Sequence, residues 1–224
     1  MSLLILPSQK AEGRSRKRIF MCPTGAFTQL PLHAAGIAST RLKEGLTDYV
    51  VPSYTPTLGA LLKARRDFGS VPRNQVKLMV AAAPYPPFRQ PLHAAVEEVS
   101  AIHAVVPPGN VLGVPWIGRA TDPLGNQLQS TTLDVLGTLP AASIVHFACH
   151  AFQDLDNPLN SGFVLQDETL TMSRLIEVKL SHAFLAVLSA CETAKGDRVQ
   201  PDQAAHLASA LMFAGFKSII GTMW

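Results

Sequence analysis

The sequence predicts an α/β fold organised around a mainly parallel central sheet. Three runs in the last third of the chain, residues 143–150, 183–191 and 217–224, are almost continuously apolar and rich in β-branched or bulky side chains. Strands of this composition are typical of sheets that are covered on both faces. A helix expected over residues 202–214 separates the second run from the third, so these two strands should be parallel neighbours joined by a right-handed crossover.

The first half of the chain supplies shorter extended segments. A strand is expected over residues 18–22, and the Pro-Thr-Gly turn and apolar segment 27–35 that follow suggest a hairpin or a strand–turn–strand unit. A second strand is expected over residues 76–83. Residues 84–92 hold four prolines and should form a loop, because proline cannot donate a backbone hydrogen bond.

Helices are expected over residues 58–65, 94–105 and 126–138. Thr55 or Thr57 can cap the first helix with its side-chain oxygen. A Pro-Pro-Gly sequence should end the second. Between the first two apolar runs the chain should form a turn-rich segment, a short strand and a short helix, over residues 154–161, 163–165 and 173–178.

Composition and charge limit the possible classes of function. The chain has 224 residues of which 47% are hydrophobic, enough for one sizeable core, so one domain is expected over residues 18–224. The net charge is only +3, and five basic residues lie within the first 18 positions, which predicts a disordered basic leader over residues 1–17. Basic and aromatic residues are not interleaved along the folded part, so no nucleic-acid partner is expected.

Localisation follows from the apolar runs and the cysteines. No run approaches the ~18 apolar residues that span a bilayer, and the short apolar start lacks the basic residues that should precede a signal sequence. The three cysteines, Cys22, Cys149 and Cys191, are an odd number in a chain that does not need disulfides. A cytoplasmic protein without a membrane partner is therefore expected.

His150 and Cys191 stand at the ends of the first two apolar runs. Ligands of parallel sheets bind beyond the carboxyl ends of the strands. If the two strands are neighbours, about 4.8 Å apart, the imidazole and the thiol come within reach of one another. A thiol with a pKa of about 8.5 needs such a base to become a nucleophile at neutral pH.

Longer motifs point to a family. HFACHA, LSACETAKGD and AAHLASALMFAGFKSIIGTMW, all within residues 146–224, resemble the CHAT family, caspase-like peptidases and relatives that are often attached to tetratricopeptide arrays and are close in fold to separase. CPTGAFTQLPLHAAG and SYTPTLGALLKAR resemble the N-terminal part of the same domain in fungal proteins. The resemblance covers residues 18–224 and implies a caspase-like three-layer sandwich. Because the chain ends inside an expected strand, we expect this sandwich to be incomplete at its C-terminus.

The resemblance also implies roles for individual residues. The catalytic histidine of the family is the second in H-x-x-x-H-G, here His150, and its catalytic cysteine is that of L-S-A-C, here Cys191. The implied reaction is cleavage of peptide bonds through a thioester, without metal or cofactor, in a signalling or regulated cell-death context. The expected partners are a protein or peptide substrate and tetratricopeptide-type domains of a full-length protein.

The expected oxyanion donors are the backbone N–H groups of Cys191 and Ala151. The family has a glycine where this chain has Ala151. If the position needs a positive φ, the methyl group costs about 1 kcal/mol. We expect Ala151→Gly to raise reactivity.

Two other interpretations use the same residues. His146, Cys149, His150 and Cys191 could form a tetrahedral zinc site, although His146 and His150 share a strand face that Cys149 does not. A catalytically inactive CHAT fold could instead serve as an interaction or scaffold module.

Substrate specificity has one candidate signal in the sequence. Asp154 and Asp156, in the loop after the candidate base, could line a pocket for a basic side chain, or could simply form turns.

Overall fold

The computed structural model describes residues 16–38, 43–66, 72–112, 129–152, 154, 156–189 and 207–221. These residues fall into two compact units, the first ending at Leu61 and the second starting at Leu62, so that the boundary lies inside helix α1 (Leu58–Arg66). Nearly all of the expected leader lies outside the described residues. The single domain expected over residues 18–224 stays a prediction.

The first unit is built on two parallel strands, β1 (Lys17–Met21) and β4 (Val50–Tyr54). The predicted hairpin start is therefore wrong, because the partner of β1 comes about 30 residues later and runs parallel to it. Parallel strands need a long connection. Two short 3-10 helices, Gly25–Gln29 and Leu32–Ala34, lie where the apolar segment had suggested a returning strand. They are followed by the antiparallel pair β2 (Gly36–Ala38) and β3 (Lys43–Gly45), and by a third 3-10 helix, Leu46–Asp48.

Helix α1 begins where the threonine pattern predicted. The Thr57 hydroxyl oxygen accepts a hydrogen bond from the backbone N–H of Ala60 at 3.0 Å, which satisfies one of the unpaired donors of the first turn. Thr55 instead donates its hydroxyl proton to the carbonyl oxygen of Thr57 at 2.8 Å. Thr57 is therefore the N-cap of α1, and Thr55 stabilises the position of Thr57 through its hydrogen bond.

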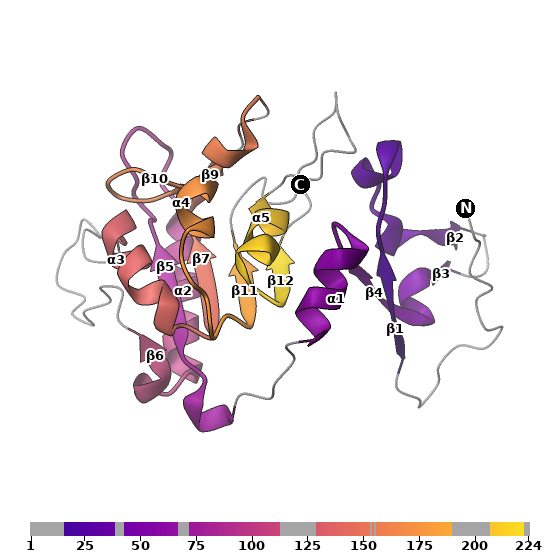
Figure 1. The fold of residues 1–224 in the computed structure, drawn as a ribbon, viewed down its shortest axis with the longest axis horizontal. Helices are drawn as coiled ribbons and strands as arrows, with labels where there is room; N and C mark the ends of the chain where they lie inside the picture. The colour runs from indigo at the N-terminus through magenta and orange to yellow at the C-terminus, as the bar shows by residue number, and fades with distance from the viewer. Residues whose placement is uncertain are drawn as a thin grey trace. The chain divides into compact units, whose positions relative to one another are not determined.

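The second unit contains the predicted parallel sheet. Among the residues that the structure describes, the five strands of this sheet all run parallel, in the order β12-β11-β7-β5-β6 (Figure 1). As predicted, the first two apolar runs form the neighbours β7 and β11, and the third forms β12, which lies beside β11 and parallel to it. The bounds are β5 (Leu78–Ala82), β6 (Val111–Leu112), β7 (Ile144–Ala148), β11 (Leu185–Leu188) and β12 (Ser218–Gly221).

Helices cover both faces of this sheet and complete the α/β sandwich (Figure 1). Alternate strand residues such as Phe147 and Leu188 pack with α3 (Thr132–Thr138), α4 (Met172–Ile176) and α5 (Leu207–Ala214). The intervening residues, among them Val80, Ala82 and Ala148, pack against Ala95 and Val99 of α2 (His93–Val105). The period-2 alternation of strands thus separates two apolar clusters, one on each face.

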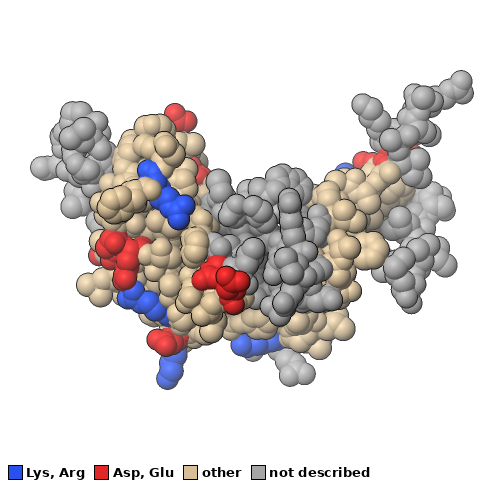
Figure 2. All heavy atoms as spheres, turned by 90° about the horizontal axis from the view of Figure 1, so that it is seen from above, with Lys and Arg blue, Asp and Glu red and all other residues tan. Residues whose placement is uncertain are grey.

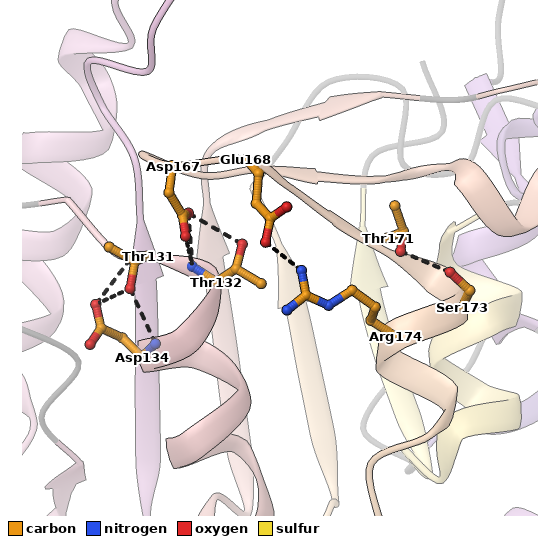
Figure 3. Close-up of polar contacts among 8 residues, drawn as sticks. All are labelled: Thr131, Thr132, Asp134, Asp167, Glu168, Thr171, Ser173 and Arg174. Carbon is orange, nitrogen blue, oxygen red and sulfur yellow. Dashed lines mark hydrogen bonds and ion pairs between the residues drawn. The ribbon is translucent and has the colours of Figure 1, made fainter.

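Helix α3 starts later than predicted, because Thr131 stops it from extending further toward the N-terminus. The Thr131 hydroxyl oxygen accepts from the backbone N–H of Asp134, and the Asp134 carboxylate accepts from the backbone N–H of Thr131. This reciprocal pair is a capping box, which fixes the first helical residue at Thr132. The carboxylate of Asp167 also accepts from the Thr132 N–H, at 2.9 Å (Figure 3).

In the described part of the same unit, three short strands form a second, antiparallel sheet in the order β10-β9-β8. The first apolar run is divided between the two sheets, since β7 ends at Ala148 and β8 begins at His150. Stacked rings of Phe147 and Phe163, with centroids 4.0 Å apart, connect the sheets. The strands are β8 (His150–Phe152), β9 (Gly162–Val164) and β10 (Thr169–Thr171), and the 3-10 helices of this unit are Arg73–Gln75, Pro108–Asn110, Leu139–Ala141 and Pro158–Asn160.

The surface of the described residues carries both signs of charge. On the face that Figure 2 shows, acidic and basic side chains are interspersed between larger uncharged areas. No helix within the described ranges is both long and apolar enough to cross a bilayer.

Candidate active site

His150 lies at the carboxyl end of the central sheet, where it opens strand β8 and is partly exposed. The sequence had predicted that it closes the preceding strand. Ala148 is the last residue of that strand, and its carbonyl oxygen still accepts from the Ala83 N–H, at 3.2 Å. The imidazole therefore emerges where the paired strands β5 and β7 end, the edge at which parallel sheets bind ligands.

A hydrogen bond within the described residues orients the imidazole. His150 Nε2 lies 2.7 Å from the carbonyl oxygen of Gln90. A carbonyl oxygen can only accept, so Nε2 carries the proton and donates it. In the neutral ring Nδ1 is then the basic nitrogen, and this is the atom that can take a proton from a thiol.

The carbonyl of Gln90 belongs to the proline-rich loop 84–92, which the sequence correctly predicted as a loop. Its neck is closed by a hydrogen bond of 2.7 Å from the Leu92 N–H to the carbonyl oxygen of Pro84. Tyr85 also makes an edge-to-face contact with His93 at the start of α2, with ring centroids 5.7 Å apart. The loop is thus anchored at both ends, which holds the carbonyl of Gln90 in front of His150.

The neighbouring strand β11 brings the chain toward the same edge. Leu188 lies opposite Phe147, and the Ser189 N–H donates to the carbonyl oxygen of Phe147 at 2.9 Å. Ser189 is the last described residue before the gap. The candidate nucleophile Cys191, whose N–H is also a candidate oxyanion donor, lies outside the described residues.

Cys149 precedes His150 but faces the core. Its side chain is fully buried in the cluster beneath α3, α4 and α5. Burial in these apolar surroundings raises the pKa of the Cys149 thiol far above its usual range. A thiol that stays protonated and has no access to solvent cannot act as a nucleophile, so Cys149 is a core residue.

His146 faces the opposite side of the sheet from Cys149. It packs toward α2, where its Nε2 lies 3.2 Å from Oε1 of Glu98. Burial lowers the pKa of His146, and the facing carboxylate partly offsets this effect. Because His146 and Cys149 point to opposite faces, they cannot bind one zinc ion, and the described residues contain no group of three potential ligands.

Ala151 does not have the backbone conformation that would penalise its methyl group. It pairs with Phe163 in the antiparallel sheet, and the only non-glycine residue with positive φ in the described ranges is Phe88. Ala151 therefore does not have the positive φ at which its methyl group would strain the backbone. The departure from the glycine of the family causes no backbone strain at this position.

Asp154 forms a turn. Its carboxylate accepts hydrogen bonds from the N–H groups of Asn157 and Asp156, at 2.8 and 3.0 Å, and from the Asn160 side chain. The N–H of Asn157 in particular lowers the pKa of Asp154. With these partners the carboxylate stabilises the local turn, the ordinary role of an aspartate in such a loop.

The comparison with known families agrees with this architecture. A family model described as the CHAT domain matches residues 1–224. The chain therefore belongs to the CHAT domain family, a caspase-like family, as its motifs predicted. No curated protein matches the chain.

Proposed function

We propose that the chain is a cysteine peptidase in which His150 is the general base and Cys191 the nucleophile. The strand register carries this proposal. Leu185 lies opposite Ile144 and Leu188 opposite Phe147, a constant offset of 41 positions. Cys191 follows His150 by the same offset. The chain that continues from β11 past Ser189 would bring Cys191 to the same carboxyl edge of the sheet at which His150 opens β8.

The state of the imidazole suits the reaction. With Nε2 donating to the carbonyl of Gln90, Nδ1 accepts the proton of the Cys191 thiol, and the thiolate attacks the carbonyl carbon of the peptide bond. The imidazolium returns this proton to the leaving amine, which leaves a thioester. Water, deprotonated by the same nitrogen, hydrolyses the thioester and regenerates the thiol.

The oxyanion would be stabilised by the backbone N–H groups of Cys191 and Ala151, as expected from the family. The unstrained backbone of Ala151 supports this role, because an alanine in extended conformation presents its N–H as a glycine does. A polypeptide is the substrate. Tetratricopeptide-type partners, a cytoplasmic location and a role in signalling or regulated cell death stay predictions.

Labelling with a peptidyl acyloxymethyl ketone, which alkylates activated thiols, tests the proposal. We expect Cys191→Ser to abolish both labelling and peptide cleavage. His150→Ala should slow both by at least about 100-fold, because it removes the general base. The control is Cys22→Ser, which removes an exposed cysteine of the first unit and should change neither rate.

The outcomes separate the peptidase from an interaction module. Cleavage that survives Cys191→Ser would show that another residue is the nucleophile. A wild-type protein that is folded by circular dichroism, but whose Cys191 reacts no faster than a free thiol, would favour an inactive CHAT fold.

A further inference from the structure

Phe88 combines two features that rarely occur together. Its φ is 60°, in the left-handed region that favours glycine, and its side chain has 103% relative exposure. A bulky side chain at positive φ is strained. The strain arises in the loop whose Gln90 carbonyl holds the candidate base.

The fold gains nothing from this aromatic ring. A fully exposed ring buries no apolar area and packs against no neighbour, so it contributes no stabilisation through the hydrophobic effect. Glycine would adopt the same backbone conformation without strain. The ring therefore contributes no hydrophobic stabilisation within the chain, and its whole surface is open to contact with another molecule.

The position of Phe88 indicates which molecule this is. Phe88 precedes Gln90 by two residues, so their Cα atoms are at most about 7 Å apart. Because the carbonyl of Gln90 is hydrogen-bonded to His150, the ring lies on the same loop that contacts the candidate base. The closed neck joins the two ends of the loop that carries the ring before any ligand arrives, which reduces the backbone entropy lost on binding.

We propose that Phe88 is a specificity-determining residue, which contacts a large apolar side chain of the polypeptide substrate close to the scissile bond. The inference rests on the proposed peptidase function and names its substrate class. Leucine, methionine and phenylalanine side chains fit a single exposed ring, which they cover by apolar and aromatic contact.

A peptide side chain fits better than a second protein surface. Arg89 and Gln90, which follow Phe88, are exposed and polar, and Pro87, which precedes it, is exposed and apolar. Among its sequence neighbours the ring therefore has only one small apolar companion. Stable protein interfaces bury of order 800 Å² on each partner around an apolar centre. One ring is enough for one substrate side chain and too little for such an interface.

The test compares peptides that differ at one position near the scissile bond, with leucine in one and alanine in the other. The kcat/KM ratio of the two peptides is measured for wild type, Phe88→Ala, Phe88→Gly and Phe88→Tyr. Binding of the same peptides to Cys191→Ala, with and without Phe88→Ala, is measured by fluorescence anisotropy. The control is Val105→Ala, an exposed apolar residue at the far end of the 13-residue helix α2, about 18 Å along its axis.

We expect wild type to prefer the leucine peptide, and Phe88→Ala and Phe88→Gly to reduce this preference about tenfold, in cleavage and in binding. Phe88→Tyr should retain it, and Val105→Ala should leave it unchanged. Phe88→Gly should also be at least as stable in thermal melting as wild type, so that lost selectivity cannot be attributed to unfolding.

Other outcomes overturn the inference. If the kcat/KM ratio of the leucine and alanine peptides is unchanged in Phe88→Ala and Phe88→Gly, the ring does not contact that side chain of the substrate. An equal loss for both peptides would assign the effect to general damage of the loop. Self-association that Phe88→Ala abolishes, with selectivity intact, would identify a contact between copies. Selective binding to Cys191→Ala without cleavage by wild type would refute the peptidase proposal and leave the recognition role of Phe88 standing.

Discussion

Cys149 and His150 are adjacent in the sequence and face different environments. One side chain is fully buried in the core, and the other is partly exposed beside the carbonyl of Gln90. A strand end produces this division, because successive side chains point to opposite faces. Cys22, by contrast, is exposed, so the thiols of Cys149 and Cys22 should differ sharply in reactivity.

We expect Cys149 to resist alkylation in the native protein. Its buried thiol has a strongly raised pKa, so almost no thiolate forms and iodoacetamide cannot reach it. Mass spectrometry at pH 8 should find it modified at least about 100-fold more slowly than Cys22, which is exposed. In denaturant the two rates should converge. Equal rates in the folded protein would show that the core around Cys149 opens readily.

Ala151→Gly should leave the labelling rate of Cys191 unchanged. The structure gives Ala151 no positive φ that a glycine could relieve. The substitution should instead lower the free energy of unfolding by about 0.5–1 kcal/mol, because glycine loses more conformational entropy when β8 forms. Urea unfolding and labelling with the acyloxymethyl ketone measure the two effects. A clear rise in labelling would show that the position adopts a different conformation during the reaction.

The motif around His150 was sufficient to predict the candidate base, since it consists of side chains in a fixed order. The carbonyl of Gln90 could not be predicted in this way. Every residue has a backbone carbonyl, and only the folded path of the loop selects the one that reaches His150. The sequence did indicate, through its four prolines, that residues 84–92 form a loop.

At the scale of elements, β9 connects the candidate site to the rest of the second unit. It pairs with β8, which begins at His150, and with β10 on its other side. Phe163 of β9 stacks on Phe147 of the central sheet. The backbone position of His150 therefore depends on close packing of the three antiparallel strands.

Gly162 is the point where this packing tolerates no side chain. A Cβ atom at Gly162 would lie 2.2 Å from the carbonyl oxygen of Leu170 in β10, a clash with backbone that cannot rotate away. We expect Gly162→Ala to destabilise the protein by about 2–3 kcal/mol, as overpacked cores do. Chemical denaturation measures this loss, and labelling of Cys191 should slow if β8 is displaced.

The matched control is Gly137→Ala in helix α3. A Cβ atom at Gly137 would have no neighbour within 4 Å. Alanine is the better helix former, so this variant should be more stable than wild type, by up to about 1 kcal/mol. If both glycine variants were equally destabilised, the clash at Gly162 would not be the cause.

Elements with a strong local pattern could be predicted from the sequence. Strands β5, β7, β11 and β12, the loop after β5 and helix α2 agree with the expected positions within a few residues, whereas no strand was expected at β6. The strand pairing at the start of the chain could not be predicted, because β1 pairs with the distant strand β4. Local turn residues carry no information about such a long-range contact. The run 143–150 is almost continuously apolar, so the sequence did not indicate that the chain passes at Cys149 from the parallel sheet to the antiparallel one.

At the scale of the whole molecule, a titratable pair lies between the parallel sheet and helix α2, which covers one of its two faces. His146 of β7 and Glu98 of α2 face each other between the sheet and the helix, and His146 is buried. A polar pair between packed layers makes the stability of the sandwich depend on pH.

We expect the second unit to lose stability as the pH falls below about 6.5. Burial lowers the pKa of His146 in the folded protein, whereas in the unfolded chain it has the ordinary value of about 6.5. Below that value the unfolded chain therefore binds a proton that the folded protein does not, and the free energy of unfolding decreases by at most about 1.4 kcal/mol per pH unit. This contribution is complete above the unfolded pKa and is lost as acidification approaches the lower, folded value.

Urea midpoints at pH 7.5 and pH 5.5 measure this dependence. His146→Gln should have a smaller difference between the two midpoints than wild type, and the control His182→Gln, at an exposed position, should match wild type. Glu98→Gln should steepen the dependence, because the Glu98 carboxylate favours the protonated imidazole and raises the folded pKa toward its ordinary value. If His146→Gln lost as much stability on acidification as wild type, the acid sensitivity would have to come from other groups, and the layer between β7 and α2 would not be its source.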